Sequence, residues 1–166
     1  CSQKVSQIDA NKYYTVSDSI VWVGYNDDPE AANDFALLRF NNNRGPHDSM
    51  NFYYDDSLTS GQVFHSVGYP TDKYETPGGN HGCTPYEQTC AYKEFYGDEQ
   101  RTYECDQAHG ASGSAIWKYN NQQKAVIYGI HSSTVYTDST KTIPWYNVDA
   151  RITKLRYDWI CAYTKN

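Results

Sequence analysis

The chain has 166 residues, a net charge of −6 and no cluster of lysine or arginine, which argues against nucleic acid or an anionic membrane as a partner. No apolar run approaches the ~20 residues of a membrane-spanning helix. Tyrosine is frequent, and Val, Thr and Ile recur in short runs, so the composition favours a β-rich fold of one domain or two small packed barrels.

Short apolar runs separated by polar turns predict a succession of strands. The predicted strands cover residues 13–16, 19–24, 35–40, 62–68, 91–96, 101–105, 114–119 and 124–131. Residues 71–90 are rich in Gly, Pro, Thr and Asn, which predicts a long surface loop. Apolar residues recur at helical spacing between 148 and 160, so we predict a C-terminal helix there.

Five cysteines in so short and polar a chain indicate an oxidising compartment and hence a secreted protein. Cys83 and Cys90 enclose six residues and are predicted to form a small loop-closing disulfide. Cys105 and Cys161 are a plausible second pair. Cys1 is then odd, which indicates a bond to another chain or a free thiol. Because the sequence has no C-x-x-C or H-x-x-x-H spacing, we predict neither a metal site nor a cofactor.

The most informative segment is Gly110–Ser114, which reads Gly-Ala-Ser-Gly-Ser and precedes an apolar strand. A turn flanked by glycines can hold the Ser112 hydroxyl away from the backbone and direct neighbouring amides at one point. Acyl transfer by a nucleophilic serine requires both features. Taken alone, however, Ser112 could be an ordinary turn serine.

Four further segments accompany this turn in a fixed order. They are Asn33–Phe40, His65–Lys73, Val126–His131 and Asn147–Thr153, the last followed by Trp159 and Ile160. In order and spacing the five segments resemble chymotrypsin-like serine proteases, in particular their glutamyl-endopeptidase branch. The resemblance covers roughly residues 30–160. The chain departs from the family at Ala115, where proline is usual.

This resemblance implies an all-β fold, the chymotrypsin-like double β-barrel with a C-terminal α-helix. Residues 1–45 would be the C-terminal strands of a first barrel that is incomplete in this chain. Residues 46–166 would form the second barrel and the helix.

The resemblance also assigns catalytic roles. Ser112 would be the nucleophile, and the backbone amides of Gly110 and Ser112 would form the oxyanion hole. Asp34 would orient the catalytic histidine and stabilise its charged form. The plainer interpretation of Asp34 is a capping or loop-ordering carboxylate.

The same resemblance places a substrate pocket at His131, Ser132 and Ser133, with Gln107 at a position where the branch usually has threonine. Glu, Asp and Gln all remain open as the P1 residue, whereas Arg or Lys is disfavoured because no acidic residue occupies the matching positions. If His131 binds a P1 carboxylate as a cation, the preference should strengthen below neutral pH. Alternatively, His131 is a satisfied core histidine.

The catalytic histidine of the family should precede Asp34, but all five histidines of this chain follow it. His109 is too close to Ser112 along a tight turn to reach the hydroxyl in line. A chain that starts at Cys1 therefore resembles the C-terminal product of a processed zymogen. We expect an N-terminal partner chain that supplies the histidine, with Cys1 as the candidate interchain cysteine, and a peptide or protein substrate. The alternative is a catalytically inactive homologue that acts as an extracellular binding or structural protein.

Overall fold

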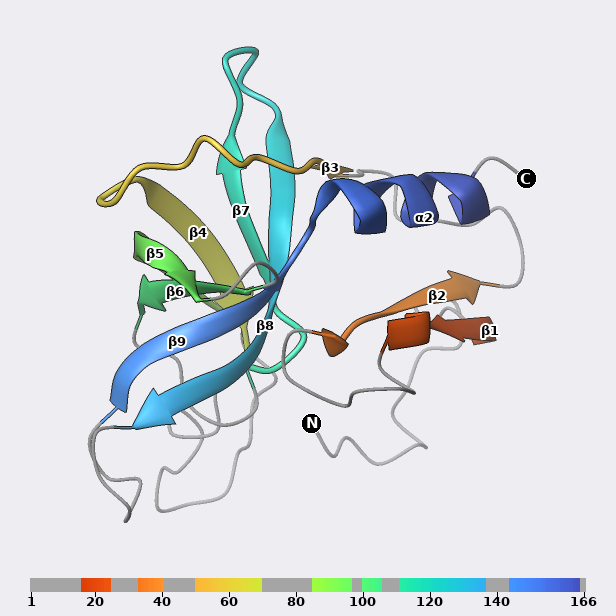
Figure 1. Ribbon diagram of the computed structural model, residues 1–166, viewed down its shortest axis with the longest axis horizontal. Helices are drawn as coiled ribbons and strands as arrows, with labels where there is room; N and C mark the ends of the chain where they lie inside the picture. The colour runs from red at the N-terminus through yellow and green to blue at the C-terminus, as the bar shows by residue number, and fades with distance from the viewer. Residues whose placement is uncertain are drawn as a thin grey trace.

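The computed structural model describes residues 16–24, 33–40, 50–69, 85–96, 100–105, 111–136 and 144–164. Within these ranges it is an all-β structure with one C-terminal helix, and a two-stranded sheet lies apart from a closed barrel (Figure 1).

Six antiparallel strands close into the barrel. They are β4 (Val63–Gly68), β5 (Tyr86–Tyr96), β6 (Gln100–Glu104), β7 (Ala115–Tyr119), β8 (Ala125–Tyr136) and β9 (Pro144–Arg151). Neighbours follow the order β8, β7, β4, β5, β6, β9, and the pairing of β9 with β8 completes the ring. The short strand β3 (Asn51–Phe52) adds to β8 in parallel. Closure leaves the six strands without free edges among themselves.

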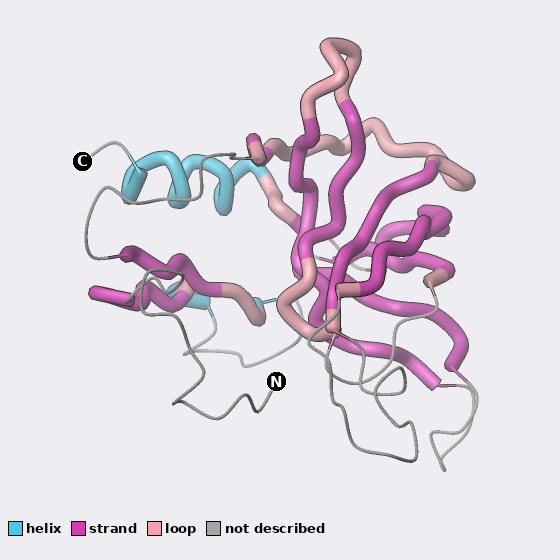
Figure 2. Tube along the Cα trace, turned by 180° about the vertical axis from the view of Figure 1, so that it is seen from behind, coloured by secondary structure: helices cyan, strands magenta, loops and turns pink. Residues whose placement is uncertain are grey.

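Strands β1 (Val16–Val21) and β2 (Ala36–Phe40) form a separate antiparallel hairpin. In the two opposite views of Figures 1 and 2 this hairpin lies beside the barrel, on the same side as the C-terminal helix. Several of its large apolar side chains are exposed to solvent. They are Val16, Val21, Leu38 and Phe40.

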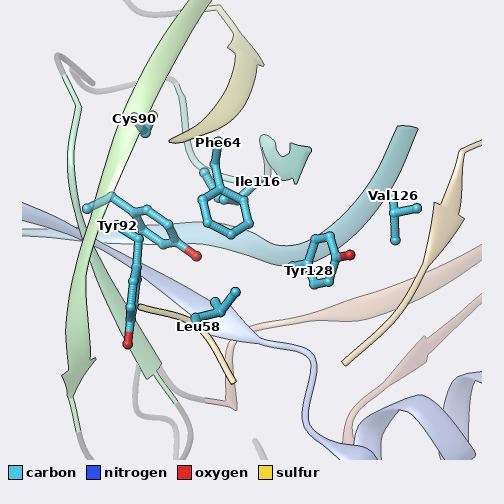
Figure 3. Packing of buried hydrophobic residues seen from close by; sticks show 8 residues of the cluster. Leu58, Phe64, Cys90, Tyr92, Ile116, Val126 and Tyr128 are labelled. Carbon is cyan, nitrogen blue, oxygen red and sulfur yellow. The ribbon is translucent and has the colours of Figure 1, made fainter. Parts of the chain in front are cut away.

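Aromatic side chains dominate the barrel core, as the tyrosine-rich composition suggests. Phe64 is fully buried, and its ring makes edge contacts with Tyr103 at 5.5 Å and Tyr128 at 5.8 Å between centroids. Figure 3 shows Ile116, Tyr92 and Tyr128 around the Phe64 ring, with Val126 farther away beyond Tyr128. The Lys118 ammonium lies 5.0 Å from the Phe64 ring centroid and 4.9 Å from that of Tyr128, so a cation caps this core.

Helix α2 (Lys154–Thr164) begins later than the sequence predicts. Thr153 caps it: its Oγ1 accepts a hydrogen bond from the Arg156 amide at 3.3 Å. Residues 148–151, predicted as the first helical turn, belong instead to β9, which pairs with both β6 and β8. Helical spacing of a few apolar residues cannot compete with strand pairing on both edges of β9 at the closure of the barrel.

The strands predicted at 35–40, 62–68 and 114–119 match β2, β4 and β7 within one residue at each end. The predicted loop 71–90 is wrong at its end, where Tyr86–Cys90 already belong to β5. No helix in the ranges above is long and apolar enough to cross a membrane.

The described disulfide joins Cys90 on β5 to Cys105 just after β6, with an S–S distance of 2.00 Å. Both predicted pairings, Cys83 with Cys90 and Cys105 with Cys161, are therefore wrong; Cys161 is a half-buried free thiol in α2. The register explains the observed bond, because Ala91 pairs with Glu104 and this places Cys90 directly opposite Cys105. Cys1 and Cys83 lie outside the described ranges.

Because this disulfide closes a 15-residue separation within the barrel, we expect the double variant Cys90→Ala/Cys105→Ala to lose about 3 kcal/mol of unfolding free energy in urea titrations. Cys161→Ala is the matched control and should change it by less than about 1 kcal/mol. Peptide mapping under non-reducing conditions that links Cys90 to any other cysteine would contradict the assignment.

Candidate active site

Ser112 occupies a tight turn at the entrance to β7. The Ser114 amide donates to the Ala111 carbonyl at 3.0 Å, which closes a four-residue turn with Ser112 and Gly113 at its centre. Gly113 has φ of +86°, the conformation that the third position of a type II turn requires and that glycine adopts most easily. Ala111 is buried while Ser112 is exposed, so the turn anchors its base and presents the serine.

Two hydrogen bonds attach this turn to strand β8. The Gly113 amide donates to the His131 carbonyl at 2.8 Å, and the His131 amide donates to the Ser114 carbonyl at 2.8 Å. The position of Ser112 is therefore fixed by the backbone of a central barrel strand.

The next residue of β8 contacts the predicted catalytic aspartate. The Ser132 hydroxyl donates to Asp34 Oδ2 at 3.0 Å, across 98 positions in the sequence. Asp34 lies just before β2, so this bond links the hairpin to the barrel beside the Ser112 turn. The Asp34 carboxylate thus has a hydrogen-bond partner on the barrel, which a role limited to capping its own segment would not require.

His131 is buried, and within the described part of the chain its Nδ1 has no hydrogen-bond partner. Burial lowers the pKa of His131 to about 4, although the nearby backbone carbonyl of Val148 opposes part of this change. The assignment of His131 to the substrate pocket, and the alternative of a core histidine, stay predictions. The lowered pKa disfavours a cation at His131 just below neutral pH in the free protein, and the P1 preference stays a prediction.

A buried polar layer lies opposite His131 on β9, and sequence reasoning missed it. Asp149 pairs with His131 in the strand register, is fully buried, and accepts a hydrogen bond from the Tyr103 hydroxyl at 3.2 Å. Its carboxylate packs directly over Gly129, where any Cβ would collide with it. A glycine in β8 is therefore a requirement of this layer.

Asn147 continues the same layer. Its Nδ2 donates to the Cys105 carbonyl at 2.6 Å, and its Oδ1 accepts from the Thr134 hydroxyl at 2.8 Å. The helical interpretation of residues 148–160 hid the alternation of polar residues along β9, which was the available signal.

The remaining predicted site residues are only partly placed. Ser133 is half-buried on β8. Gly110 and Gln107 lie outside the described ranges, so the oxyanion hole and one wall of the pocket stay predictions. The ranges that are described contain no cluster of three or more His, Cys, Asp or Glu residues able to hold a metal ion.

Among the described residues, no histidine ring hydrogen-bonds Ser112. His65 stacks on Trp117 at 4.5 Å between ring centroids and its Nδ1 lies 3.2 Å from Glu87 Oε1, on another part of the barrel. His131 is the second described histidine, and the other three lie in ranges that the structure does not describe. The predicted need for a histidine from outside the chain remains a prediction.

The buried neutral state of His131 makes a testable contribution to stability. A histidine whose pKa falls from 6.5 unfolded to about 4 folded destabilises the fold as pH decreases through this window, because the unfolded chain binds the proton more readily. Between pH 7 and pH 4 the wild type should lose unfolding free energy, and His131→Gln should lose about 3 kcal/mol less. Urea titrations at several pH values measure both losses. Parallel pH profiles for the two proteins would contradict this result.

Comparison with known proteins relates this arrangement to solved folds. No protein-family model and no curated protein matches the sequence. A solved structure described as a Glu endopeptidase in complex with MPD is 22% identical with a TM-score of 0.74, over 95% of this chain and 66% of that one. A thermostable serine protease, AL20, from an extremophilic microorganism is 13% identical with a TM-score of 0.67, over 95% and 71%. The chain thus spans about two thirds of the length of these proteins, and it has the chymotrypsin-like serine protease fold.

Proposed function

We propose that the chain is the aspartate- and serine-bearing part of a secreted serine endopeptidase, with Ser112 as nucleophile and Asp34 as the residue that orients the histidine. The single observation that carries the proposal is the link through β8. One residue of this strand holds the Ser112 turn through two backbone bonds, and the next residue holds Asp34.

The proposed chemistry needs a base between these two groups. The histidine would take the proton from Ser112 Oγ as the oxygen attacks the peptide carbonyl, and it would return the proton to the leaving amine. Asp34 would stabilise the charged imidazole, while Ser132 keeps the carboxylate in place. Water would then release the acyl group from Ser112.

We propose that an N-terminal partner chain of the same precursor supplies this histidine. A two-stranded sheet is marginal by itself, and β1–β2 exposes large apolar side chains that further strands would cover. The two serine proteases of the same fold are longer than this chain. Cys1 is the candidate for a disulfide to that partner. Non-reducing electrophoresis of the native protein tests this bond. A single species near 19 kDa with no associated chain would exclude the bond.

We propose that the protein is secreted, because disulfides such as Cys90–Cys105 form and persist in oxidising compartments. For the P1 residue we propose an acidic or amide side chain, bound near His131 and Gln107. The neutral state of His131 favours a hydrogen bond over an ion pair with the substrate. The solved relative described as a Glu endopeptidase supports this class by fold only.

We expect a fluorophosphonate probe to label the native, assembled protein at Ser112. Ser112 Oγ would form a bond to phosphorus as fluoride leaves, and the serine proton would pass to the partner's histidine. Ser112→Ala should abolish labelling, measured by mass spectrometry of the modified peptide.

Ser114→Ala is the matched control, because it removes a hydroxyl from the same turn and should retain labelling. Absence of an adduct at Ser112 in the assembled wild-type protein would overturn the enzyme proposal and favour the inactive homologue.

A further inference from the structure

The position of Asp34 depends on how the β1–β2 hairpin is held against the barrel. In the described part of the chain no strand of the barrel pairs with either β1 or β2. An apolar pocket of about 170 Å³, partly open to solvent, also lies at this junction, lined by Phe35, Ala36 and Leu37 on the hairpin side and by Ile127 and Ile130 on the barrel side. Close packing alone therefore does not fix the segment that carries Asp34.

Arg156 of helix α2 bridges this junction. It is 1% exposed, although arginine is rarely buried without partners. Its Nη1 donates to the Arg151 carbonyl at the end of β9 at 2.7 Å, and its Nη2 donates to Asn33 Oδ1 at 3.0 Å. One planar guanidinium thus contacts the barrel strand β9 and the residue directly before Asp34.

The residue directly after Asp34 is held by the same side chain. The Arg156 guanidinium carbon lies 5.0 Å from the centroid of the Phe35 ring and 5.8 Å from that of Trp22. Phe35 and Trp22 stack at 5.4 Å, and Trp159 of α2 meets both rings edge-on. Arginine suits such a site because its flat cation donates in two directions while stacking on aromatic faces.

We propose that Arg156 is a positioning residue for Asp34, holding Asn33 and Phe35 on either side of it so that the carboxylate stays at Ser132. This inference rests on the proposed function, because Asp34 matters for catalysis only in an active enzyme. Arg156 acts through its neighbours and does not contact the reacting atoms.

The experiment uses the full precursor after processing, with a fluorophosphonate as the probe. We expect Arg156→Met to lower the maximal labelling rate of Ser112 by about 10- to 100-fold, because small displacements of catalytic groups have effects of this size. The probe concentration for half-maximal rate should change by less than about twofold, since the probe site is untouched.

Two further variants separate positioning from general destabilisation. Asn33→Ala removes the acceptor of Arg156 and should reproduce the rate loss; the double variant with Arg156→Met should be no slower than the slower single variant. Arg156→Lys keeps the charge but has a single donor nitrogen, so it should recover part of the rate. If Arg156→Met fails to fold, Asn33→Ala and Arg156→Lys still decide the question.

Arg39→Met is the matched control. Arg39 also joins the hairpin to α2, through Nη2 and the Tyr163 carbonyl at 3.5 Å, but it is exposed and lies at the far end of β2. We expect Ser112 in the Arg39→Met variant to be labelled at the wild-type rate. Equal losses in Arg39→Met and Arg156→Met would indicate general loosening of the hairpin and would overturn the proposal.

Hydrogen exchange supplies a readout that does not need activity. Arg156→Met should increase amide exchange in residues 33–37 without changing strands β7 and β8. If Arg156→Met keeps both the wild-type exchange in residues 33–37 and the wild-type labelling rate, the inference is overturned. A wild-type protein that is never labelled would instead refute the proposed function, while faster exchange in Arg156→Met would still support its role in holding Asp34.

Discussion

The rest of the structure depends on the hydrogen bonds that residues Gly129–Ser132 of strand β8 make to neighbouring segments. At His131 the strand holds Gly113 and Ser114, the second half of the Ser112 turn, and through Ser132 it binds Asp34. Its other edge pairs with β9 and closes the barrel. A four-residue segment therefore joins the serine, the aspartate and the barrel closure, and a shift in its register would displace all three together.

The hairpin and the barrel depend on the C-terminal helix for their relation to each other. Trp159 and Arg156 project from α2 onto Trp22 and Phe35, so the last element of the chain secures its first strands. The helix is short and needs this tertiary packing for its own stability. The mutual arrangement explains how a charged residue can be almost fully buried, because Arg156 has acceptors on both sides of the junction.

Sequence reasoning succeeded where the signal is local and failed where it is tertiary. The strands β2, β4 and β7 follow from short apolar runs, and the turn at Ser112 follows from its glycines. Cysteine spacing could not reveal the Cys90–Cys105 bond, since it depends on the register of β5 and β6. Burial, which lowers the pKa of His131, and the polar partners of Asp149 also appear only when distant strands meet.

The pocket between the hairpin and the barrel has a mechanical consequence. It is partly open to solvent, and it is lined by Phe35 and Leu37 on one side and Ile130 on the other. Side chains that face such a gap lack packing partners on that side. The junction is therefore more weakly packed than the barrel core, and under load the hairpin would separate from an intact barrel before the barrel itself unfolds.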